Sequence, residues 1–160
     1  MATALAKEQT WSYVLTEATN ILVVDDDPIL REFASVYLAT PAASVKTAAD
    51  VTSALALIKE QTFDIVLIDI EMPGRDGYEL LEILRSRPET RNTTVMMLTA
   101  HEDIASIDRS YELGATAFTT KPVNWRQLSY QIRYLLRSAR IERELRQRLN
   151  GTIHSGLSSE

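Results

Sequence analysis

The chain has 160 residues, of which 45% are hydrophobic and 24% charged, so a globular domain with a sizeable core is expected. The net charge of −5 argues against direct nucleic-acid binding, and the absence of cysteine excludes disulfides and thiolate zinc sites. No apolar run approaches the ~20 residues that span a bilayer, and no secretory signal begins the chain, so we expect a cytoplasmic protein without a membrane segment.

Residues 1–19 form an N-terminal extension whose structure the sequence leaves open. Trp11, Val14, Leu15 and Ala18 have helical spacing, which favours a short amphipathic helix. A frayed, disordered terminus explains the same residues equally well.

Residues 20–136 alternate short apolar runs with amphipathic stretches and are predicted to be one domain. Each run ends in turn residues, which is typical of a buried strand. The predicted strands are Ile21–Val24, Ser44–Thr47, the run from Phe63 to Asp69, Thr94–Leu98 and Ala117–Thr120. Because a helical pattern follows each strand, we expect an α/β fold with a parallel sheet covered on both faces.

Several predicted helices have recognisable starts. Pro28 suits a first turn, and Asp50 is a plausible cap. Capping-box spacing occurs at Asp76 with Glu79 and at Asn124 with Gln127. The apolar face of the first helix is expected to be Ile29, Leu30, Phe33, Val36 and Tyr37, and the inward residues of the fourth to be Ile104, Ile107 and Tyr111.

Chemically matched side chains follow four of the predicted strands. The first strand leads to Asp25 and Asp26, the third to Asp69, the fourth to Thr99 and the fifth to Lys121. In a right-handed parallel sheet these strand ends lie on one edge, where ligands bind. We therefore expect three carboxylates, a hydroxyl and an ammonium group to converge.

This set of groups suits a metal ion and a phosphoryl group. Crowded carboxylates favour a hard cation such as Mg²⁺, and an aspartate can attack phosphorus to form an acyl phosphate. A cation and Lys121 would then balance the phosphoryl charge. Taken singly, an aspartate after a strand is usually a turn former or a helix cap, and Asp27 fits that role.

The sequence resembles the receiver domain of bacterial two-component response regulators, a CheY-like family. The resemblance rests on four segments that together span about residues 20–136: 21–28, 69–77, Leu98-Thr99-Ala100 and Lys121-Pro122. It implies a flavodoxin-like, doubly wound (βα)5 three-layer sandwich with strand order 2-1-3-4-5 and an extended C-terminal helix.

The resemblance also implies a role for each residue. Asp69 would be the phosphoacceptor; Thr99 and Lys121 would assist the chemistry. Mg²⁺ would be held by Asp25, Asp26, Asp69 and the backbone carbonyl of Glu71. Thr99 and Phe118 would be the switch pair, and the Lys121-Pro122 bond would be cis.

The partner implied is a sensor histidine kinase or a phosphotransfer protein, and the chain itself would be a signalling phosphoprotein, not an enzyme. Some positions depart from the family pattern. Thr116 and Ala117 replace acidic residues that many DNA-binding regulators use in dimers, and Val123 stands where phenylalanine is common. Glu71 and His101 occupy positions that tune dephosphorylation, so the lifetime of the phosphorylated state stays open.

The last helical pattern is longer than a helix that only covers the sheet. Residues 137–150 carry Ile141, Leu145 and Leu149 among many arginines, without a strict heptad. A signalling helix or a homodimeric coiled coil is one interpretation, and a solvated helix held by Glu and Arg pairs is the other. Residues 151–160 are expected to be a flexible tail or a truncated linker.

Two rival functions remain open from sequence. One is a binding module of receiver shape without phosphoryl chemistry, and the complete acidic and lysine set argues against it. The other is a phosphatase with an aspartyl-phosphate intermediate, but the residue two places after Asp69 is Glu71 instead of aspartate, and no substrate cap is evident.

Overall fold

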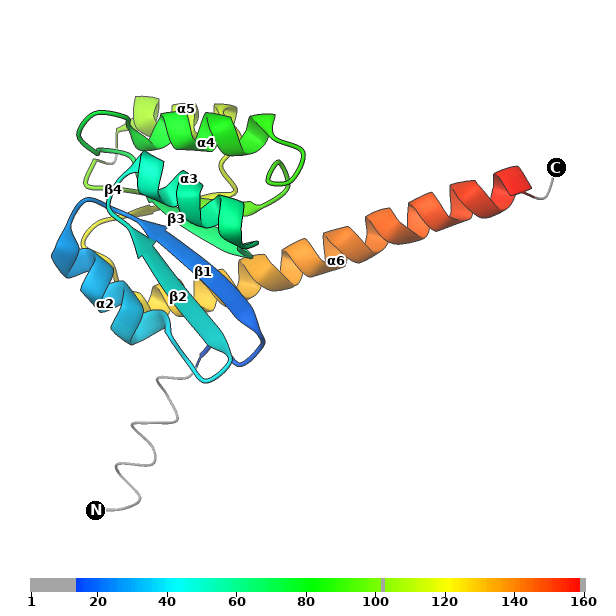
Figure 1. Ribbon diagram of the computed structural model, residues 1–160, viewed down its shortest axis with the longest axis horizontal. Helices are drawn as coiled ribbons and strands as arrows, with labels where there is room; N and C mark the ends of the chain where they lie inside the picture. The colour runs from blue at the N-terminus through cyan, green and yellow to red at the C-terminus, as the bar shows by residue number, and fades with distance from the viewer. Residues whose placement is uncertain (1–13, 102, 159–160) are drawn as a thin grey trace, which may run out of the picture.

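The computed structural model describes residues 14–101 and 103–158 (Figure 1). Its centre is a parallel sheet in the order β2-β1-β3-β4-β5, which confirms the predicted topology. The strands are β1 (Thr19–Val24), β2 (Ala43–Ala48), β3 (Ile65–Asp69), β4 (Thr94–Thr99) and β5 (Ala117–Thr120). All residues of β3 and β4 are buried, as expected for central strands covered on both faces.

Helices cover both faces of the sheet and complete a three-layer sandwich (Figure 1). They are α2 (Pro28–Leu38), α3 (Val51–Glu60), α4 (Gly77–Ser86), α5 (Ile104–Glu112) and α6 (Trp125–Ser158). In the hydrophobic core, α3 and α4 pack on one side of the sheet, and α2 and the first turns of α6 pack on the other.

The predicted caps are formed. The Asp50 carboxylate accepts the Ser53 amide at 2.7 Å, and Asp76 accepts the Glu79 amide at 3.0 Å. Asn124 Oδ1 accepts the amide of Gln127 at 3.1 Å. Because each cap satisfies a free amide of a first turn, the start of each helix is fixed by local sequence.

The predicted face of α2 was wrong. Of the residues expected to share it, only Leu30 is buried, and Ala34 and Leu38 complete the buried side. The exposed residues are Ile29 at 64%, Phe33 at 46%, Val36 at 64% and Tyr37 at 46%. Tyr37 stacks on Trp125 of α6 with ring centroids 6.1 Å apart, so the outer side of α2 is strongly apolar.

The predicted inward face of α5 was wrong for two of its three residues. Ile104 is 77% exposed and Tyr111 is 49% exposed, whereas Ile107 is half-buried and the fully buried residue is Ser110. The Ser110 hydroxyl donates to the carbonyl of Ser106 at 2.8 Å, so the buried polar group is satisfied within the helix.

The two ends of the chain differ from expectation in different ways. Trp11 and the first part of the proposed N-terminal helix lie outside the described residues; residues 14–18 form no helix, although Val14 and Leu15 are buried. At the other end, α6 continues to Ser158, so residues 151–158 are helical where a flexible tail or a truncated linker was expected. Figure 1 shows α6 leaving the domain as a long projecting arm.

Candidate functional site

The carboxyl edge of the sheet gathers the predicted acidic residues. Asp25 follows β1 and is fully buried, Asp69 ends β3 and is 3% exposed, and Asp26 is exposed beside them. One carboxylate oxygen from each lies within 4.8 Å of the others. The predicted convergence of the three side chains is therefore present.

Lys121 joins this cluster from the end of β5. Its Nζ atom lies 2.8 Å from Asp25 Oδ2 and 3.3 Å from Asp69 Oδ1. The Lys121-Pro122 bond is cis, as the resemblance implied, and the Lys121 amide donates to the carbonyl of Thr99 at 2.8 Å. The ammonium group is thus held between two carboxylates from neighbouring strands.

The backbone fixes Asp25 from both sides. Its Oδ1 accepts the Asp27 amide at 2.9 Å, and Arg31 donates to its carbonyl at 2.8 Å. Asp27 also caps α2 by accepting the Ile29 amide at 2.9 Å, which is the structural role expected of it. The strand end and the helix start therefore hold Asp25 in one orientation.

The electrostatics of Asp69 and Lys121 are opposed. Burial raises the pKa of Asp69 from its ordinary 3.8 to about 7, and the charge of Asp25 adds to this, while Lys121 acts against it. Burial by itself would lower the pKa of Lys121, but hydrogen bonding and charge from Asp25, with the charge of Asp69, outweigh it and raise the pKa. The single positive charge of Lys121 therefore balances only part of the negative charge of the clustered carboxylates.

The donor set fits a small hard cation. Asp25 Oδ2 is buried and, apart from its ion pair with Lys121, accepts no hydrogen bond from the described residues. Asp26 is exposed and the cluster consists of carboxylate oxygens, which matches the preference of Mg²⁺ for oxygen ligands and retained waters.

The remaining predicted residues lie around this cluster. Thr99 ends β4 and is 1% exposed, and its hydroxyl oxygen accepts the His101 amide at 3.1 Å. Glu71 donates its amide to Asp69 Oδ1 at 3.4 Å, and its carboxylate lies 2.9 Å from Nε2 of His101. Phe118 is partly buried against the core beneath α3 and α4.

No structural role was predicted for Gly77, the last residue of the segment 69–77. It begins α4, and a Cβ atom placed on it would collide with the backbone carbonyl oxygen of Asp69. Its amide donates to the carbonyl of Ile70 at 2.9 Å. The signal was the glycine directly after the Asp76 cap, where a helix must pass close to the strand end.

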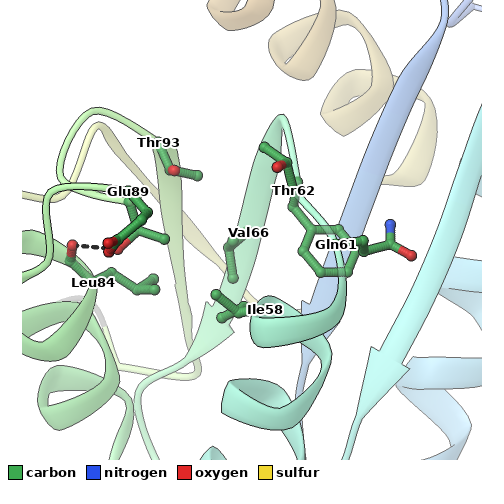
Figure 2. Close-up of a pocket in the computed structure, with 9 residues that line it drawn as sticks. Ile58, Gln61, Thr62, Val66, Leu84, Glu89 and Thr93 are labelled. Carbon is green, nitrogen blue, oxygen red and sulfur yellow. Dashed lines mark hydrogen bonds between the residues drawn. The ribbon is translucent and has the colours of Figure 1, made fainter.

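A small cavity at the opposite edge of the sheet has no part in this site. Figure 2 shows Ile58, Val66 and Leu84 among its lining residues, near the amino ends of β3 and β4. Its volume of about 50 Å³ leaves room for a few waters only. The chemistry of the described residues therefore centres on Asp69.

Within residues 14–101 and 103–158, we find no helix that combines the length and apolarity needed to cross a bilayer. This finding concerns helices of the described chain alone.

Known proteins share this fold and sequence. Residues 21–133 match the family model of the response regulator receiver domain. The chain is 33% identical over 124 residues to the transcriptional regulatory protein ResD of Bacillus subtilis, covering 78% of this chain and 50% of that protein. It is 35% identical over 131 residues to the response regulator PleD of Caulobacter vibrioides, covering 82% of this chain and 29% of that one.

Solved structures agree with these sequence relatives. A CheY-like receiver domain protein from Methanospirillum hungatei superposes with a TM-score of 0.73 at 30% identity, covering 79% of this chain and 99% of that one. NtrX from Brucella abortus superposes with a TM-score of 0.74 at 29% identity, covering 80% of this chain and 29% of that one. The chain thus spans half or less of the curated relatives it matches. The matched region, the sheet order and the acidic edge agree, and the chain belongs to the response regulator receiver domain family of two-component signalling.

Proposed function

We propose that Asp69 accepts a phosphoryl group from a partner histidine kinase or phosphotransfer protein, in a step that depends on Mg²⁺. The observation that carries the proposal is the Lys121 ammonium group, 3.3 Å from Asp69 Oδ1 and 2.8 Å from Asp25 Oδ2, beside three clustered carboxylates. This geometry supports the proposal because a carboxylate that could act as nucleophile, an ammonium group and carboxylate oxygens suited to a metal ion lie together at one edge of the sheet.

Asp25, Asp26, Asp69 and the carbonyl of Glu71 would hold the metal ion. When bound, Mg²⁺ supplies positive charge to the phosphoryl oxygens and lowers the repulsion among the carboxylates. Lys121 supplies a second positive charge from the chain itself and keeps Asp69 oriented by their contact.

The chemical step needs the ionised form of Asp69. A carboxylate oxygen attacks phosphorus, an oxygen–phosphorus bond forms, and the bond to the donor histidine nitrogen breaks. Because burial raises the pKa of Asp69 to about 7, positive charge near this side chain favours the reactive form.

Thr99 and Phe118 would pass the signal outward. The Thr99 oxygen already accepts an amide, so its hydroxyl proton is available for a phosphoryl oxygen. Phe118 lies on neighbouring β5 and lines an outer groove beside α6, which links the site to the surface. A shift of Thr99 toward the phosphoryl group would bias the position of Phe118.

Residues 20–136 would act as the receiver unit and residues 137–150 as a signalling extension. Ile141, Leu145 and Leu149 are between 53% and 63% exposed on this extension, which favours a homodimer through α6 over a purely solvated helix.

Phosphorylation with acetyl phosphate and Mg²⁺ tests the central proposal. The intact mass should rise by one phosphoryl group in the unmodified chain, and the increase should vanish in Asp69→Asn and on removal of Mg²⁺. Asp50→Asn is the matched control, because asparagine caps a helix as well as aspartate and residue 50 follows edge strand β2. An undiminished mass increase in Asp69→Asn would show that the nucleophile is another residue.

A further inference from the structure

We propose that two copies of this chain pair in parallel along one face of α6, in a defined heptad register. We call this face the α6 seam; its residues are Gln131, Tyr134, Ser138, Ile141 and Leu145. The proposal deepens the dimerisation proposed above and makes no use of phosphoryl chemistry.

The seam lies to one side of the face of α6 that packs on the domain. Leu128 and Ile132 are buried against the sheet, and Leu135 and Leu136 pack at the same side. At 100° per residue, the seam is centred about 125° around the helix from that packed side. The helix therefore carries two apolar faces, and only one of them is used within the chain.

The exposure of the second face is large. Tyr134 is 71% exposed, Ile141 is 59% exposed and Leu145 is 53% exposed. Their spacing of seven and four residues keeps them in one line along the arm that Figure 1 shows leaving the domain. Single exposed apolar residues are ordinary, but an aligned row on a projecting helix is typical of helix pairing.

The register follows from the same spacing. Tyr134 and Ile141 take the d positions, and Gln131, Ser138 and Leu145 take the a positions. The buried Ile132 and the partly buried Leu136 then fall at b and f, which face away from a coiled-coil partner, whereas Leu128 and Leu135 fall at e, beside the seam. Domain packing and helix pairing thus use different but neighbouring positions of α6, and a partner helix on the seam would lie beside the domain.

Charges beside the seam favour parallel pairing of identical chains. Arg137 takes a g position and Glu142 the e position five residues later, which are the positions that meet between parallel helices. In a two-fold symmetric dimer this contact forms twice, because Arg137 of each chain meets Glu142 of the other. Glu142 already lies 3.5 Å from Arg146 in its own chain, so it would bridge two arginines.

The seam continues into a groove on the domain. Gln127, Gln131 and Tyr134 line a groove of about 360 Å³ whose other wall is formed by residues of β4 and β5, including Phe118. A partner helix lying on the seam would cross the end of this groove. The paired face therefore runs unbroken from the switch position to the arm.

The arm also contains an opposing force. Residues 137–150 hold five arginines and two glutamates, which gives a net charge of +3 on each arm. Two parallel arms repel through solvent, and salt screens this repulsion over about 8 Å at physiological ionic strength. Salt screens the attraction between Arg137 and Glu142 as well, so pairing is compared at one fixed ionic strength.

Single cysteines test the register cleanly, because the chain has none of its own. Oxidation of Ser138→Cys and of Leu145→Cys should each give a covalent dimer. Gln147→Cys, on the outer side of the arm, is the control and should stay monomeric. A dimer only on mixing Ser138→Cys with Leu145→Cys would mean antiparallel pairing and would overturn the proposal.

Charge reversal gives a second, non-covalent test by sedimentation equilibrium of the full chain. Glu142→Arg should raise the dissociation constant about tenfold, because it removes the attraction to Arg137 and adds positive charge to the arm; the double variant Arg137→Glu with Glu142→Arg keeps the parent's net charge and should restore it. Equal weakening in the double variant, or no weakening in Glu142→Arg, would contradict the pairing of these residues.

The outcome can be separated from that of the proposed phosphorylation. Both assays are run without a phosphoryl donor and repeated in Asp69→Asn. Cross-linking at residues 138 and 145 in both backgrounds supports the seam, whatever the phosphorylation assay gives. Monomers at every concentration, with intact phosphorylation of Asp69, would remove the seam and leave the site proposal standing.

Discussion

At the scale of single residues, Asp69 ties the stability of the protein to pH. Its pKa of about 7 lies above its ordinary 3.8, so the folded chain binds more protons between these values. The resulting stabilisation is complete below about pH 4 and is lost as the pH rises through 7. The metal-free protein should therefore become less stable over this window.

Asp69→Asn should remove that pH dependence. We expect the variant to exceed the unmodified chain by on the order of 2 kcal/mol at pH 8 in the absence of metal, and to lose the advantage near pH 4. Urea unfolding across the pH range measures the difference, and added Mg²⁺ should narrow it at pH 8. Parallel pH profiles for the two proteins would contradict the assignment.

Lys121 is expected to stabilise the fold as well as to serve the site. Lys121→Met would leave Asp25, which is fully buried, facing Asp69 without a cation. Breaking one partner of a buried ion pair costs about 3 kcal/mol. Urea unfolding at pH 8 without metal measures the loss. Asp69→Asn in the Lys121→Met background should recover part of it, because the repulsion is then removed; purely additive effects would argue against coupling.

At the scale of elements, α4 is docked where only glycine fits. Gly77→Ala would push its Cβ into the Asp69 carbonyl oxygen, so we expect a loss of about 2 kcal/mol or more together with slower phosphorylation. Gly151→Ala is the matched control, because the space around that glycine in α6 is open and alanine favours helix there. Thermal unfolding of both variants makes the comparison, and equal behaviour would contradict the close approach.

The order of the elements and the edge that bears the site were predictable, but two helix faces were not. Leu30, Ala34 and Leu38 are buried in α2, yet the outer residues Phe33 and Tyr37 are larger and equally apolar, so hydrophobicity alone could not choose a side. In α5 the buried position is occupied by a small hydroxyl residue bonded to its own helix, which gives no apolar signal.

The same reasoning explains what was missed at the site and at the end of the chain. The need for Gly77 depends on how closely α4 passes the end of β3, which is a tertiary distance that spacing does not give. Gly151 destabilises a helix by only about 1 kcal/mol, which a long helix tolerates, so α6 continues through it. The small and polar composition of residues 151–160 therefore did not predict that the helix continues.

At the scale of the whole molecule, the domain should fold without the arm. The residues of α6 that pack on the core end at Leu136, and beyond it the described contact with the body includes the exposed ion pair of Arg140 with Glu17, 2.6 Å apart. Such surface pairs contribute less than about 1 kcal/mol.

A chain ending after residue 137 should therefore keep its unfolding temperature within a few degrees of the parent and keep full phosphorylation of Asp69. Circular dichroism on heating, together with the acetyl phosphate assay, checks this. Loss of cooperative unfolding would show that the arm is part of the core.

The arm consists of one unbroken helix that begins inside the domain, since α6 runs for 34 residues from Trp125 to Ser158. At 1.5 Å per residue it is about 50 Å long, so a tilt of about 10° at its base would sweep the distal end through about 9 Å. A displacement too small to disturb packing near Phe118 would thus be magnified, as by a lever, for whatever stands at the far tip.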